Sequence, residues 1–89
     1  MTLFTKEGCQ KCDYLKRKVD FEAMGIRVEE LGRNNPEALA HLAWHELVTV
    51  AQKHLPILVL DDSSYIVDVI PILRYLKGKG ARIERDIRG

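Results

Sequence analysis

The stretch TKEGCQKCDYLK, residues 5–16, decides how the fold and chemistry of this 89-residue chain are interpreted. It contains Cys9 and Cys12, the two cysteines of the chain, three positions apart. A β-type run, TLFT at 2–5, leads into it, and apolar residues at helical spacing follow it. Two thiols at this spacing carry electrons, hold a metal ion or form a structural disulfide, and the rest of the sequence helps to choose between these roles.

The composition is that of one small folded domain. Hydrophobic residues make up 46% of the chain, and 14 Lys and Arg nearly balance 13 Asp and Glu, so no basic surface for nucleic acid is expected. No apolar run approaches the ~20 residues of a membrane span, and the N-terminus lacks the apolar core of a signal peptide. We therefore expect a monomeric, cytoplasmic protein with no membrane partner. In that reducing setting a cysteine pair is more often catalytic or metal-binding than structural.

Four short strands are predicted from β-branched and apolar runs. The first two are separated by a helical pattern, so they should be parallel and joined by a right-handed crossover. The last two should form a tight hairpin over the turn residues DDSS, 61–64. The expected strands are 2–5, 26–31, 56–60 and 65–67.

Three helices are predicted from apolar residues that recur at intervals of three and four. The first should end at Gly25, and the second should begin with Asn35 as its cap. The last should have Asp68 as its cap and end at Gly78, which leaves 81–89 as a polar C-terminal tail. The expected order is β-α-β-α-β-β-α, an α/β fold with one four-stranded mixed sheet and helices on both of its faces.

The start of the first helix makes the two thiols chemically unequal. Cys9 falls where free N–H groups and the helix dipole favour negative charge, and Lys6 and Lys11 act in the same direction. Cys12 lies one turn inside the helix on its apolar face, so its thiol should be shielded. Residues three apart on a helix are neighbours, so the sulfurs can bridge. This pattern predicts that Cys9 attacks a substrate disulfide and that Cys12 then releases the reduced substrate.

The segments FTKEGCQKC, 4–12, and HLPILVL, 54–60, resemble the glutaredoxins, which have the thioredoxin fold. They are most similar to the small glutaredoxin-like electron donors of ribonucleotide reductase. The resemblance implies a thioredoxin-like three-layer sandwich over residues 1–80. It implies a redox-active disulfide with Cys9 as nucleophile and Cys12 as resolving thiol, no bound cofactor, no metal, and a protein disulfide as the substrate.

The same resemblance implies a substrate site around this disulfide. Pro56 would be a cis-proline that faces the cysteines, and the backbone of Leu55 would offer hydrogen bonds to the substrate. Lys6 matches the basic residue that such proteins often place three positions before the first cysteine. Gln10 and Lys11, between the cysteines, are the further expected substrate contacts.

Three differences from the glutathione-using relatives concern the electron source. Gln10-Lys11 stands where those proteins usually have Pro-Tyr or Pro-Phe, and HLP, 54–56, stands where they have Thr-Val-Pro. The segment YIVDVIP, 65–71, contains no Gly-Gly pair to hold the tripeptide. We therefore expect glutathione to be a poor reductant and a flavoprotein of the thioredoxin reductase type to be a better one.

Two histidines admit a metal-binding interpretation. His41 and His45 stand four apart, so the pattern C-x2-C…H-x3-H can be written for the chain. However, 28 residues separate Cys12 from His41, against the ~12–15 of zinc fingers. A pair of solvated helix histidines is the expected outcome.

Other residues have alternatives that the sequence leaves open. His54 either tunes Cys9 near neutral pH or is a partly exposed loop residue. Lys6 and Lys11 are either functional or ordinary solvated charges. Trp44 is either at the rim of the core, which is favoured, or a contact for a partner. The alternative function is a binding module on a thioredoxin scaffold whose cysteines hold a metal or a cluster.

Overall fold

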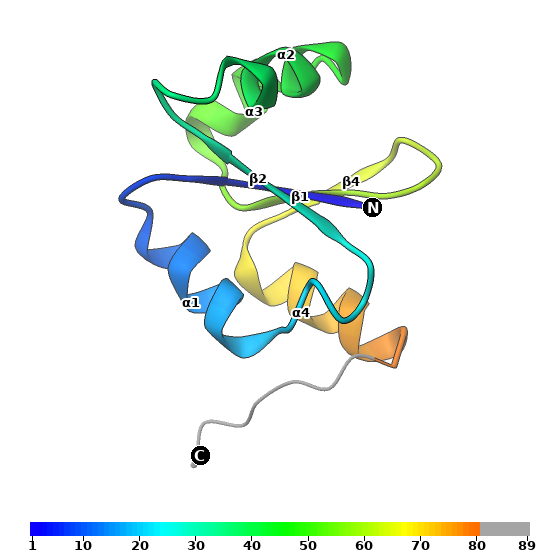
Figure 1. Cartoon of the computed structure of the whole chain (residues 1–89). Helices are drawn as coiled ribbons and strands as arrows, with labels where there is room; N and C mark the ends of the chain where they lie inside the picture. Colours follow the sequence, from blue (N-terminus) through cyan, green and yellow to red (C-terminus); the bar gives the residue numbers. More distant parts are fainter. Residues whose placement is uncertain (81–89) are drawn as a thin grey trace.

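The computed structural model describes residues 1–80 as a small α/β fold with a four-stranded mixed sheet and four helices (Figure 1). The proposed tail at 81–89 lies outside the described residues. No helix within 1–80 has both the length and the apolar character that a membrane crossing requires. In chain order the elements are β1 (Thr2–Lys6), α1 (Gln10–Lys18), β2 (Arg27–Leu31), α2 (Pro36–Trp44), α3 (Val48–Lys53), β3 (Ile57–Val59), β4 (Tyr65–Val67) and α4 (Val69–Gly78).

The sheet has the strand order β2-β1-β3-β4. β1 and β2 are parallel, as expected for two strands joined through a helix, and β3 is antiparallel to both β1 and β4. Leu58 lies opposite Leu3 on one side and Ile66 on the other. The β3–β4 hairpin is closed by a hydrogen bond of 2.8 Å from the Leu60 N–H to the Ser64 carbonyl. The predicted mixed sheet and hairpin are therefore confirmed.

Helices cover both faces of the sheet, with α1 and α4 on one face and α2 and α3 on the other (Figure 1). Leu3 of β1 belongs to the core between the sheet and α1 and α4, together with Leu15 and Leu76. The next residue, Phe4, belongs to the core under α2 and α3 with Leu42. Because side chains alternate along a strand, β1 contributes to two separate hydrophobic cores, one on each face of the sheet.

The first helix is shorter than predicted. α1 ends at Lys18 instead of continuing to Gly25, and Val19 is extended, with φ −129° and ψ 133°. A side-chain hydrogen bond explains the ending: Asp20 Oδ1 accepts the N–H of Ala23 at 3.1 Å, which fixes a turn in place of another helical turn. Gly25 has φ +71° in this turn, so it reverses the chain toward β2 and does not end the helix itself.

The second predicted helix is two helices. α2 ends at Trp44, and the chain bends at Glu46, where φ is +59°, before α3 begins at Val48. The VTV run at 48–50 has strand propensity but is helical here. Val48 and Val50 pack against the core of Phe4, and this burial outweighs their intrinsic preference.

The last helix runs past its predicted stop. α4 includes Gly78, and its capping residue is Lys79. Gly80 then adopts φ +91°, the left-handed conformation that commonly follows a helix C-terminus. The stop signal is therefore the second glycine of the KGKG segment.

Candidate functional site

Three connecting segments meet at one end of the sheet. In the strand register, Ile57 at the start of β3 lies opposite Phe4 near the end of β1, and opposite Val67 at the end of β4. The N–H of Asp68 donates to the carbonyl of Pro56 at 3.0 Å and joins two of these segments. The segments brought together are 7–9 before α1, 54–56 before β3, and residue 68 before α4.

Cys9 and Cys12 form an asymmetric thiol pair at this end. Cys9 is the N-cap of α1, and its Sγ accepts the backbone N–H of Cys12 at 3.2 Å. Both thiols are free; Cys9 is partly exposed, whereas Cys12 is fully buried. Cys9 is therefore the more exposed cysteine and lies where a helix start presents N–H donors, whereas Cys12 is buried one turn further along the chain.

Burial raises the pKa of the Cys12 thiol from 9.0 to about 12. A hydrogen bond with Cys9 acts in the same direction, and the charge of Lys16 opposes it only in part. At neutral pH Cys12 is consequently a protonated thiol, as a resolving cysteine should be before a substrate has reacted.

This asymmetry predicts selective alkylation. Iodoacetamide at pH 7–8 should label Cys9, and Cys12 should stay unlabelled in the folded protein because its thiol is buried and protonated. Labelling of Cys12 should begin only as the pH approaches its pKa of about 12, or on denaturation. Peptide mass spectrometry after timed labelling measures both rates. Faster labelling of Cys12 at neutral pH would reverse the assigned roles.

The Leu55–Pro56 bond is cis, as expected from the sequence. Pro56 is fully buried at the start of β3, and Leu55 is partly buried against the core of Phe4. His54 caps the end of α3 and lies half exposed with its Nδ1 3.7 Å from Asp68 Oδ2. Among residues 1–80 no hydrogen bond or ion pair joins His54 to Cys9, so its partner in the structure is Asp68.

Asp68 is a site residue that the sequence did not reveal. It was expected to cap α4, but its side chain makes no capping hydrogen bond. Its backbone has φ +73° and ψ 159°, a region that is essentially restricted to glycine and that costs about 1–3 kcal/mol elsewhere. Helix N-caps are often Asp, so the sequence offered no signal against a cap. The strained backbone instead places a carboxylate beside His54, above the start of α4.

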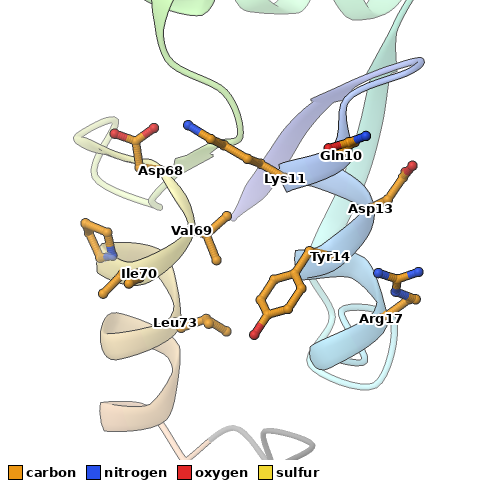
Figure 2. A pocket seen from close by; sticks show the side chains of 10 residues that line it. Gln10, Lys11, Asp13, Tyr14, Arg17, Asp68, Val69, Ile70 and Leu73 are labelled. Atoms are coloured by element: carbon orange, nitrogen blue, oxygen red, sulfur yellow. The ribbon is translucent and has the colours of Figure 1, made fainter. Parts of the chain in front are cut away.

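An open groove of about 1050 Å³ runs between α1 and the start of α4 (Figure 2). Lys11 extends from α1 toward the start of α4, where Asp68 lies, and Tyr14 points across toward Leu73. The α4 side of the groove is apolar, and side chains of both charges also line it. The groove is lined by Gln10, Lys11, Asp13, Tyr14, Arg17, Asp68, Val69, Ile70, Pro71 and Leu73.

The predicted substrate contacts are distributed unevenly around this groove. Gln10 and Lys11 line it. Lys6 is exposed at the end of β1, outside the groove, and its carbonyl accepts the Cys9 N–H at 3.2 Å. Its position is therefore set by the turn that presents Cys9.

Two expectations for α2 are wrong. His41 and His45 are not solvated: both are half-buried and in polar contact with each other, and His41 also contacts Glu29. Trp44 is 81% exposed and does not belong to the rim of the core. It points outward because Leu42 already supplies the buried contact of this turn. Phe4 contacts the His41 ring on the face opposite α1, so the histidines and cysteines do not assemble into one site.

No family model matches the chain, and the searches of curated proteins and of solved structures found no match either. The features that bear on function are a partly exposed thiol at a helix start, a buried second thiol, a cis-proline segment and a groove between α1 and α4.

Proposed function

We propose that the protein is a glutaredoxin-like thiol–disulfide oxidoreductase with a thioredoxin-like fold that reduces protein disulfides in the cytoplasm. The observation that carries the proposal is the Cys9–Cys12 pair. One sulfur is accessible at the N-cap and accepts an N–H at 3.2 Å, and the other is buried directly behind it. The sheet order and the cis Leu55–Pro56 bond at the same end of the sheet support it.

The reaction needs only these two thiols and a disulfide. The Cys9 thiolate attacks one sulfur of the substrate, an S–S bond breaks, and the first substrate thiolate leaves. Cys12 then attacks the Cys9 sulfur of the mixed disulfide, its proton passes to the departing substrate sulfur, and a Cys9–Cys12 disulfide forms. Two electrons have moved from the protein to the substrate. A reductant must return them to begin the next cycle.

The groove between α1 and α4 is suited to hold the chain that carries the substrate disulfide. Tyr14, Ile70 and Leu73 offer apolar contact, and Lys11 and Asp68 offer charges of opposite sign at the end where α1 and α4 begin. A groove of mixed character binds an extended peptide better than a small uniform ligand does. The proposed substrate is thus a protein disulfide in an accessible, flexible segment.

A redox titration tests the proposal. Equilibration in buffers of graded dithiol and disulfide ratio should convert two thiols into one Cys9–Cys12 disulfide reversibly, with a two-electron slope of ~30 mV per tenfold change. Thiol counting by mass spectrometry follows the conversion, and Cys9→Ser serves as the control that cannot convert. Stoichiometric metal in protein purified under reducing conditions, with no reversible disulfide, would instead favour a carrier that uses the cysteines as ligands.

A further inference from the structure

A polar cluster lies on the opposite face of the sheet from the cysteines and takes no part in the proposed reaction. Glu29 of β2 is 8% exposed, and its Oε2 lies 2.9 Å from both Arg27 Nε and His41 Nδ1. His41 Nε2, on α2, lies 3.2 Å from Nε2 of His45, the residue that caps the end of this helix. Four side chains are thus in contact in the order Arg27, Glu29, His41 and His45, and the Nε2 atoms of the two histidines face each other.

The spacing of these nitrogens fits one bound metal ion. Two nitrogens at ~2.0–2.1 Å from a shared ion, with an angle of ~100° at the ion, lie ~3.2 Å apart. The observed Nε2–Nε2 separation is 3.2 Å. Histidines four apart on a helix reach a common ion from one face, as in the H-E-x-x-H zinc sites. His41 and His45 therefore have the correct separation before any ion binds.

The orientation of His41 is fixed by contacts on the side away from His45. The Glu29 carboxylate accepts a hydrogen bond from Nδ1, so Nε2 presents its lone pair outward. Arg27 holds the same carboxylate oxygen, and the edge of the Phe4 ring packs against the imidazole at a centroid distance of 5.3 Å. A carboxylate behind a ligating histidine is the usual second layer of a metal site, where it sets the tautomer and strengthens the ligand.

We propose that His41 and His45 bind one divalent transition-metal ion through their Nε2 atoms. Imidazole pairs favour Cu²⁺, Ni²⁺ and Zn²⁺ and disfavour Mg²⁺ and Ca²⁺, which take oxygen ligands. Within residues 1–80 no cluster of three or more His, Cys, Asp and Glu side chains is placed to hold a metal, so water completes the coordination.

Zn²⁺ titration of the full chain, followed through the imidazole nitrogens by NMR, tests the proposal directly. The chain has three histidines, so His54 is an internal control on another part of the surface. In protein whose Cys9–Cys12 disulfide has been formed, so that the thiols cannot bind the ion, Zn²⁺ should shift the Nε2 resonances of His41 and His45 together, saturate at one ion, and leave His54 unchanged. Mg²⁺ should shift none of them. Unchanged His41 and His45 resonances, or equal shifts of all three histidines, would overturn the site.

Variants separate the two histidines from the cysteines. In a Cys9→Ser/Cys12→Ser background, calorimetry with Ni²⁺ should show at least a ~10-fold loss of affinity for His41→Gln or His45→Gln and none for His54→Gln. Glu29→Gln keeps the shape of the side chain but weakens its hydrogen bond with His41 Nδ1, and it should lower the Ni²⁺ affinity by ~10–100-fold. Circular dichroism shows whether each variant is folded. If a variant does not fold, the NMR titration of the protein with unchanged histidines still tests the site. Ni²⁺ affinity unaffected by His41→Gln in a folded variant would contradict the proposal.

Discussion

Cys9→Ser is expected to abolish disulfide reduction, with a loss of at least ~1000-fold in turnover. A serine hydroxyl at the N-cap of α1 can still accept the Cys12 N–H, so the fold should be retained. It is not a nucleophile toward sulfur at neutral pH, because the reactive species is a thiolate. Reduction of a protein disulfide by the reduced protein, measured in single turnover, gives the rate.

Cys12→Ser should fail in a different way. Cys9 still attacks, but no second thiol can release the substrate, so a stable mixed disulfide should accumulate and be visible by mass spectrometry. Because Cys12 is fully buried, Cys12→Ala is the matched control for the cost of placing a hydroxyl there. Both variants should trap the substrate equally. Full multiple-turnover activity in folded Cys9→Ser, or trapping through Cys12 in that variant, would disprove the mechanism.

Glutathione is expected to reduce the Cys9–Cys12 disulfide poorly, and a flavoprotein dithiol reductase of the thioredoxin reductase type to reduce it well. Glutathione carries two carboxylates, and the groove presents the Asp68 carboxylate at the end where α1 and α4 begin. The Asp68 N–H is already bonded to Pro56, so it is not free to bind a ligand. Losing two or three hydrogen bonds at ~0.5–1.5 kcal/mol each lowers affinity by roughly one to three decades. Both electron sources should be assayed with the same disulfide substrate.

Substitution of Asp68 tests whether its carboxylate is the reason that glutathione reduces the disulfide poorly. Asp68→Asn removes the charge alone, and Asp68→Gly removes the charge together with the strain of the glycine-only backbone conformation. Each should raise glutathione-dependent turnover by about fivefold, the equivalent of ~1 kcal/mol of repulsion. The rate with the flavoprotein reductase should change less. Efficient turnover with glutathione and none with the reductase would overturn the prediction and point to other contacts for the tripeptide.

The sequence predicts the strands better than the helix ends. The strands follow from local patterns: β-branched runs are bounded by turn residues, and the helical segment between the first two requires them to be parallel. The helix ends depend on contacts that no local pattern contains. Asp20 stops α1 by bonding the N–H of Ala23, and Val48 and Val50 are helical because they pack on the core of Phe4. Neither predicted glycine ends its helix: α1 ends at Lys18, before Gly25, and α4 includes Gly78.

In the candidate site too, features that depend on neighbouring residues were predicted and features that depend on distant contacts were not. The spacing of the cysteines and their place at a helix start are readable from residues close in sequence, and the cis Leu55–Pro56 bond was expected from the resemblance of HLPILVL, 54–60. The contacts of Asp68 with His54 and of Glu29 with His41 join residues more than ten positions apart. Neither pair has a sequence signature, because each depends on how the sheet brings its connecting segments together.

Strand β1 gives this small protein two compartments that do not share side chains. Leu3 faces the core beside the thiol helix, and Phe4, its neighbour, touches His41 on the other side. Hydrogen bonds to β2 and β3 hold the strand on both edges, so the partition is rigid. Selection can therefore adjust the histidine side residue by residue without altering the environment of the thiols. Substitutions on one face of the sheet are then expected to leave the other face unchanged.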